Sequence, residues 1–255
     1  MKLPLLSLLA LGAMFAPSHA AAPTTLLAQP DKELISDALT ASSKPAEWKA
    51  AKGKWERAED GTHVEQIPAD NHGAASRVTT KFQDCVVAVE FRLDGANSIS
   101  LSINSLKEHM ARVTISPTAL RIQRDDSDHD GPDKAVLFLA QAEKFEPGTW
   151  HSIVLEMLGD TMVATIDGKI SGFGSNDLFK LEKANPGLTC GGKSATFRNF
   201  SIWSVKAEPK ADWKATSAKI AEAMKAAPQP PAPAAAAAAK GKAAAKGKGK
   251  AAAAK

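Results

Sequence analysis

Residues 86–93 read VVAVEFRL and residues 98–104 read SISLSIN, and these two stretches decide the fold class. In the first stretch, apolar side chains fall at every second position from Val87 onwards, and Glu90 and Arg92 fall between them. In the second stretch, isoleucine or leucine alternates with serine. Alternation with a period of two is typical of strands that have one buried face and one open face. Both stretches therefore predict β-strands.

The same pattern continues outward along the chain. Asp-Gly, Pro-Gly and Gly-Asp pairs recur as turn signals, and short segments rich in Val, Ile, Phe and Thr lie between them. Many short strands separated by regular turn signals predict an all-β sandwich or barrel. The further strands are expected at residues 112–116, 120–123, 135–140, 150–158, 161–167, 187–190 and 195–205.

Composition divides the chain into five segments. A helix is expected before Pro228, because Trp213, Ile220 and Met224 lie among Ala and Lys. The chain beyond it is almost entirely Ala, Pro, Lys and Gly, which cannot bury a core and predicts disorder. We expect a signal peptide at 1–20, a linker at 21–34, a β-sandwich domain at 35–207, a helix at 208–226 and a disordered basic tail at 227–255.

The first twenty residues have the three parts of a secretory signal. Lys2 precedes a mostly apolar run, Pro17 stops any helix, and Ser18-His19-Ala20 is a small-x-small cleavage site. The run is shorter than the ~20 residues that span a bilayer. We therefore expect cleavage and export to the periplasm or the extracellular space, and a retained membrane anchor is the alternative. No second long apolar stretch follows, so we expect no transmembrane segment in the mature chain. We also expect the protein to be a monomer.

Charge is distributed unevenly. The net charge is +4, but seven lysines and no acid follow Glu222 and Lys2 leaves with the signal, so residues 21–222 carry −4. A nucleic-acid-binding domain would carry its positive charge on the fold, which argues against that function for the core. The lysine tail could contact polyanions of an anionic envelope, or it could be a solubilising spacer.

The open faces of the first four predicted strands are polar. If these strands are neighbours, their polar side chains form one surface suited to a sugar, although an ordinary solvated sheet face would show the same alternation. The side chains of this expected surface are Glu90, Arg92, Ser98, Ser100, Ser102, Arg112, Thr114, Arg121 and Gln123.

Several motifs resemble those of the 3-keto-disaccharide hydrolase domain family, in their order and spacing over residues 45–205. The opening WKAAKGKWERAEDG resembles that family's pair of tryptophans with a closing Asp-Gly. The segments that carry the rest of the resemblance are Trp48–Gly61, Val89–Arg92 with Asn97-Ser98, Gly148–His151, Asp167-Gly168, Pro186–Leu188 and Phe197–Phe200.

The resemblance implies a concanavalin A-like jelly-roll sandwich of two antiparallel sheets and hydrolysis of glycosides oxidised at carbon 3. This chain departs from the family pattern in two places. Asn97-Ser98-Ile99 stands where the family has N-S-G, and residues 112–115 replace its G-x-E-x-Q strand. Three functions therefore stay open: an enzyme that cleaves modified sugars, a non-catalytic glycan-binding module, and a structural envelope protein.

Candidate catalytic residues follow from the chemistry of keto sugars. Elimination next to a ketone needs a base for the proton and an electrophile for the carbonyl. Glu90, His109 or His72 could be the base, and Arg92, Arg112 or a metal could be the electrophile. The expected substrate-binding set is Arg112, Arg121, Gln123, Ser98, Ser100 and His72.

Two further features leave alternatives open. Asp126, Asp128 and Asp130 alternate before Gly131, as in the first half of a calcium loop, but position twelve is Leu137. The segment is therefore either a calcium or other divalent metal site or a charged hairpin loop, and no cofactor is required. Cys85 and Cys190 could pair in an exported protein, or they could be two buried free thiols.

Overall fold

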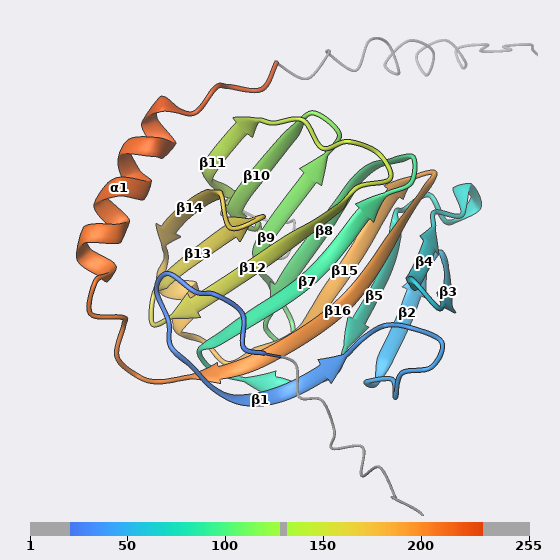
Figure 1. The fold of residues 1–255 in the computed structure, drawn as a ribbon, viewed down its shortest axis with the longest axis horizontal. Helices are drawn as coiled ribbons and strands as arrows, with labels where there is room; N and C mark the ends of the chain where they lie inside the picture. The colour runs from blue at the N-terminus through green and yellow to red at the C-terminus, as the bar shows by residue number, and fades with distance from the viewer. Residues whose placement is uncertain (1–20, 128–131, 232–255) are drawn as a thin grey trace, which may run out of the picture.

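The computed structural model describes residues 21–127 and 132–231 as a sandwich of two antiparallel β-sheets with one C-terminal helix (Figure 1). The expected all-β sandwich is confirmed. The first sheet has the order β14 (Ile170–Ser175), β13 (Thr161–Ile166), β12 (Trp150–Leu158), β7 (Cys85–Leu93), β16 (Ser194–Val205), β4 (Gly61–Glu65) and β3 (Lys54–Ala58), with β1 (Pro30–Asp37) also paired to β16.

The second sheet lies against the first. Two short 3-10 helices, Pro68–Asp70 and Asp177–Lys180, lie in connections between strands. The order of the second sheet is β11 (Val136–Ala142), β10 (Ala119–Arg124), β9 (His109–Ser116), β8 (Ala96–Asn104), β15 (Lys183–Gly192), β5 (Ala74–Val78) and β2 (Trp48–Lys52), with β6 (Lys81–Phe82) also paired to β15.

The core lies between the two sheets and follows the alternation of the strands. Val87 and Phe91 of β7 are fully buried, as are Leu101 and Ile103 of β8. Burying a side chain of this size stabilises the fold by roughly 1.5–3 kcal/mol. The side chains between them on each strand point to the outer face of their own sheet. Two outer faces, one on each side of the sandwich, are therefore available for binding.

Strands β7 and β8 are consecutive in the chain, but they lie in different sheets. The connection passes through Gly95, whose φ of 105° suits glycine because it has no Cβ. Alternation shows that each strand has a buried face, but it does not show which sheet the strand joins. The single polar surface expected across these strands is therefore wrong, and its residues are divided between two outer faces.

The C-terminal helix is confirmed. Helix α1 (Trp213–Ala226) packs against β14 at the edge of the first sheet (Figure 1). Its Trp213 ring meets the ring of Phe173 edge-on at 5.6 Å between centroids. Ile220 is buried, and Met224 packs against the main core. The apolar residues that predicted the helix therefore also attach it to the sandwich.

Residues 21–34 do not form the expected linker. Residues 21–28, named the strap here, lie against the outer face of the first sheet, and Leu27 and Ala28 are buried there. β1 then begins at Pro30 and pairs with β16. The sequence of the strap shows no strand periodicity. The strap is held instead by Glu156, a residue far away in sequence, whose side chain accepts hydrogen bonds from the backbone of the strap.

The two cysteines are buried free thiols, which confirms that alternative over a disulfide. Cys85 lies on β7 and Cys190 on β15, in different sheets. Burial raises the pKa of each thiol to about 12. Both groups are therefore un-ionised at neutral pH and contribute to the core as small apolar side chains.

Some of the expected features lie in parts of the chain that the structure does not describe. The expected signal peptide at 1–20, residues 232–255 of the tail expected at 227–255, and Asp128 and Asp130 lie outside the described residues. Within residues 21–127 and 132–231, no helix is long and apolar enough to cross a membrane.

Candidate functional site

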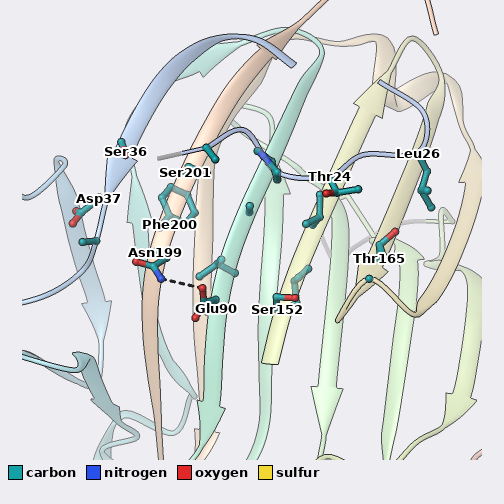
Figure 2. A pocket seen from close by; sticks show the side chains of 18 of the residues that line it. Thr24, Leu26, Ser36, Asp37, Glu90, Ser152, Thr165, Asn199, Phe200 and Ser201 are labelled. Carbon is teal, nitrogen blue, oxygen red and sulfur yellow. Dashed lines mark hydrogen bonds between the residues drawn. The ribbon is translucent and has the colours of Figure 1, made fainter. Parts of the chain in front are cut away.

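The outer face of the first sheet carries a cleft of about 820 Å³ beside the strap (Figure 2). This volume falls in the range of ~300–1,000 Å³ that small-molecule sites occupy. The cleft floor comes from β7, β12, β13 and β16. Its lining includes Thr24 and Leu26 of the strap, Ser36 and Asp37 of β1, and Glu90, Ser152, Thr165, Ser171, Asn199 and Ser201 of the sheet.

Strand register arranges the outer side chains of this sheet in rows that run across the strands. The rows change from charged and aromatic to hydroxyl-bearing and then to apolar. From one end of β7 to the other, they are Thr196–Arg92–Trp150, Arg198–Glu90–Ser152, Ser201–Ala88–Val154–Thr165–Ser171 and Trp203–Val86–Glu156–Val163–Phe173.

Glu90 lies at the centre of the sheet and is about one third exposed. One of its oxygens accepts a hydrogen bond from Arg198 Nε at 2.7 Å, and the other accepts one from Asn199 Nδ2 at 2.9 Å. A bulge in β16 brings both partners to the same carboxylate, because two residues of β16, Asn199 and Phe200, lie there opposite one of β7, Val89. Asn199 has a φ of 53°, a left-handed conformation that asparagine tolerates.

An aromatic ring contacts two cations at the next row. The guanidinium of Arg198 stands 3.8 Å from the ring centroid of Trp150, and that of Arg92 stands 4.9 Å from it. Arg92 also pairs with Asp94 at 2.7 Å and with Asp60 at 3.1 Å. The hydrogen bond to Asp94 is the main cause that raises the pKa of Arg92. This arrangement keeps a fixed positive charge beside an aromatic face.

A histidine extends this charged cluster. His63 of β4 pairs with Asp60 at 2.7 Å, and that hydrogen bond is the main cause that lowers the pKa of Asp60. Both side chains are nearly half exposed. The rim of the site therefore carries a carboxylate–histidine pair joined through Asp60 to Arg92.

Hydroxyl groups are frequent in the two inner rows. Thr165 and Ser171 are hydrogen-bonded to each other at 3.0 Å, and Ser152 and Ser201 lie on either side of β7. Hydroxyls both donate and accept hydrogen bonds, so they match the hydroxyl groups of a sugar. The small side chain of Ala88, next to Ser201 in its row, leaves room for a ligand over the sheet.

Asp37 also lines the cleft, but both oxygens of its carboxylate already accept hydrogen bonds from the protein. Its side chain is buried and accepts hydrogen bonds from Arg57 Nη1 and Nη2, Trp48 Nε1 and the backbone of Leu39 and Ala46. Burial alone would raise the pKa of Asp37, but these hydrogen bonds and the charge of Arg57 together lower it. Among the residues that line the cleft, Glu90 is therefore the carboxylate available to a ligand.

Only two of the expected polar-surface residues lie on this face of the sandwich. Glu90 and Arg92 are here, whereas the others belong to the outer face of the second sheet, where many already have partners. Arg112 pairs with Asp125 at 2.6 Å, and Gln123 donates to the same carboxyl group at 3.0 Å. The members on the second sheet are Ser98, Ser100, Ser102, Arg112, Thr114, Arg121 and Gln123.

The expected histidines lie elsewhere as well. His109 begins β9 of the second sheet, and its Nδ1 lies 2.9 Å from the Asn104 side-chain oxygen. His72 precedes β5 of the same sheet, and its Nδ1 lies 2.7 Å from the Gly73 carbonyl oxygen. Neither lines the cleft, so of the three alternative bases only Glu90 faces it, and His109 and His72 lie with the other sheet.

The expected metal loop is described only in part. Asp126 belongs to the described residues, where no group of three His, Cys, Asp or Glu side chains is arranged to hold a metal ion. Asp133, which follows the loop, instead pairs with Arg124 at 3.1 Å.

Sequence reasoning missed the hydroxyl groups of β12, β13 and β16 and the role of the strap. The alternation of Trp150, Ser152 and Val154 was a usable signal, since it marks the outer face of a strand. The bulge that places Arg198 and Asn199 beside Glu90 had no such signal, because it appears only when the two strands pair.

Comparisons with known proteins bear on the family and the fold. The family model described as the 3-keto-alpha-glucoside-1,2-lyase-like domain matches residues 38–202. A search of curated proteins found no match.

Three solved structures share the fold at low identity. The carbohydrate-binding module CBM66 of Bacillus subtilis has a TM-score of 0.50 at 12% identity, covering 62% of this chain and 96% of that chain. The Crh5 transglycosylase in complex with NAG has a TM-score of 0.54 at 12% identity, covering 71% and 88%. The Bacillus licheniformis beta-glucanase has a TM-score of 0.50 at 8% identity, covering 70% and 100%. They confirm the concanavalin A-like sandwich.

Proposed function

Because the chain belongs to the 3-keto-alpha-glucoside-1,2-lyase-like domain family, we propose that it binds a saccharide in the cleft of the first sheet and cleaves glycosides oxidised at carbon 3. The observation that carries this proposal is the position of Glu90. It faces the cleft from the central strand, with hydroxyl groups on one side and the Trp150 ring on the other. Carboxylate, hydroxyl and aromatic groups together suit a sugar ring.

The chemistry proposed for Glu90 is an elimination. The ketone at carbon 3 makes the proton on carbon 2 acidic, and Glu90 takes that proton. The electron pair of the C2–H bond forms a double bond between carbons 1 and 2, and the glycosidic C1–O bond breaks. Glu90 then returns the proton to the leaving oxygen. Arg198, which is hydrogen-bonded to Glu90, supplies positive charge near the carbon 3 oxygen, on which negative charge develops.

Hydrolysis by the usual pair of carboxylates is less consistent with the cleft. That mechanism needs two carboxyl groups, about 5 Å apart for retention or roughly 6.5–9.5 Å apart for inversion. Asp37 is the other carboxylate of the lining, and Arg57, Trp48 and two backbone N–H groups surround it. Elimination needs one base, which the cleft provides.

A second candidate is a non-catalytic glycan-binding module. It is favoured by the bonds of Glu90 itself, because both carboxylate oxygens already have partners in Arg198 and Asn199. In either case, we propose that the signal at 1–20 exports the protein and that the lysines beyond Glu222 hold it at an anionic surface. Release of a tail-deleted protein from the cell surface at the same rate as the full chain would exclude that attachment.

The test is incubation of the full chain with 3-keto-disaccharides, with and without EDTA. We expect turnover, and loss of about 100-fold to 10,000-fold in E90Q, which is the range of general base catalysis. E182Q is the matched control, because Glu182 is an exposed glutamate paired with Lys81 outside the cleft. Binding without turnover would establish the second candidate, and neither binding nor turnover would reject both. Loss of turnover in EDTA would show a metal requirement.

A further inference from the structure

The strap forms one wall of the cleft, although it takes no part in the proposed chemistry. Ala21, Pro23, Thr24 and Leu26 all line the cleft, and Figure 2 shows Thr24 and Leu26 beside the strands that carry Ser152 and Thr165. The strap lies over the apolar end of the rows described above, because its Leu27 and Ala28 pack with Val86 of β7.

A buried carboxylate fixes this wall. Glu156 is fully buried and accepts hydrogen bonds from the backbone N–H groups of Leu26, Leu27 and Ala28 at 2.7–2.8 Å. Lys210 also donates to the carbonyl oxygen of Thr25 at 2.8 Å. A segment with four such bonds and three buried residues, Thr25, Leu27 and Ala28, is a fixed part of the sandwich.

The other sides of the cleft differ from one another. Ser36–Ala38 of the β1 end line it on one side, and Gly168 and Ser171 of the β13–β14 hairpin line it on the other. Away from the strap, along β7, the rows lead to Arg92 and Trp150, which are partly exposed. A ligand in the cleft is therefore confined at the strap and on two flanks, and it has a polar surface ahead of it only in the direction of Trp150.

We propose that the strap makes the cleft an end-binding site, which takes the terminal sugar of a saccharide and lets the rest of the chain leave toward Trp150. The proposal rests on the proposed function and adds that Glu156 is its positioning residue. An internal sugar would need to leave the cleft in two opposite directions, and the strap closes one of them.

The experiment compares two maltohexaose derivatives, one carrying the 3-keto group on its terminal non-reducing glucose and the other on a central glucose. The readout is the ratio of kcat/KM for the two, or of their affinities where no turnover occurs. One variant is the full chain without residues 21–24, which keeps the donors to Glu156 and the bond to Lys210. The second variant is E156Q, and the control is E222Q on the exposed face of α1.

The wild-type chain and E222Q should prefer the terminal isomer by at least about tenfold, and both strap variants should bring the ratio close to one. A wild-type chain that accepts both isomers equally, or strap variants that keep the full preference, would overturn the role of the strap while leaving the proposed function intact. A wild-type chain that neither binds nor cleaves either isomer would reject the proposed function instead, and the strap inference with it.

Discussion

Replacing Asp37 by asparagine should destabilise the protein more than any exposed aspartate replacement. The Asp37 side chain is buried and joins three parts of the fold, since β1 carries it, β3 contributes Arg57, and the connection before β2 contributes the backbone N–H groups of Leu39 and Ala46. Asparagine has the same shape, but it presents one oxygen and one NH₂ group to this set of donors.

The magnitude follows from the bonds that are lost. If the remaining oxygen takes the Oδ2 position, Arg57 Nη1 and the Leu39 N–H group face a donor instead of an acceptor. Breaking a buried ion pair costs roughly 3–5 kcal/mol. Arg57 is about one quarter exposed and regains some hydration, so we expect a loss of about 3 kcal/mol, at the lower end of that range. This is a large part of a typical stability of ~5–15 kcal/mol.

The assay is urea unfolding followed by far-UV circular dichroism at pH 7, with D177N as the matched control. Asp177 is almost fully exposed and pairs with the exposed Lys180, so the same substitution there should leave the midpoint unchanged. Equal midpoints for D37N and D177N would refute the reasoning. The hydrogen bonds that lower the pKa of Asp37 also make its contribution complete above pH 4, and it should decline as the pH falls through the lowered value.

Three further predictions concern stability and burial, and the first two use the same equilibrium measurements. W150A should lose about 1–2 kcal/mol, because two guanidinium groups lose their aromatic face, and an unchanged midpoint would contradict the geometry of that stack. Burial raises the pKa of Glu156, so the folded state binds its proton more tightly, and the stability of the wild type relative to E156Q should fall as the pH rises above 4.5; parallel pH curves would argue against this. Cys85 and Cys190 should not react with a thiol reagent in the native protein and should both react in denaturant, whereas no reaction in denaturant would indicate a disulfide.

The sequence predicted the strands because each strand has one apolar face. The alternation around Val87 and Leu101 determines that both strands are half buried, and the structure places both side chains in one core. The same alternation could not predict the sheet to which each strand belongs, because a strand looks the same in sequence whichever sheet it joins. This is why Glu90 and Ser100 were expected on one surface and lie on opposite faces.

The candidate site was predictable only in its centre. Glu90 and Arg92 stood out as charges on a strand that is otherwise apolar. Arg92 has a near partner in Asp94, but Arg198 and Thr196 lie more than one hundred residues away, and pairing of β7 with β16 brings them to Glu90 and Arg92. The strap was missed for the same reason, since Glu156 holds it from a distance of about 130 residues along the chain.

The outer face of β7 shows why the cleft lies where it does. From Val86 through Ala88 to Glu90 and Arg92, the outward side chains change from apolar to charged. The apolar end needs cover, because an exposed valine row with Val163 and Trp203 beside it would be an exposed apolar patch. The strap supplies that cover. The charged end exposes no apolar row and needs no such cover. Glu90 therefore stays open to a ligand while Val86 is covered. The outward side chains of this one strand determine both where the wall of the site lies and which group can react.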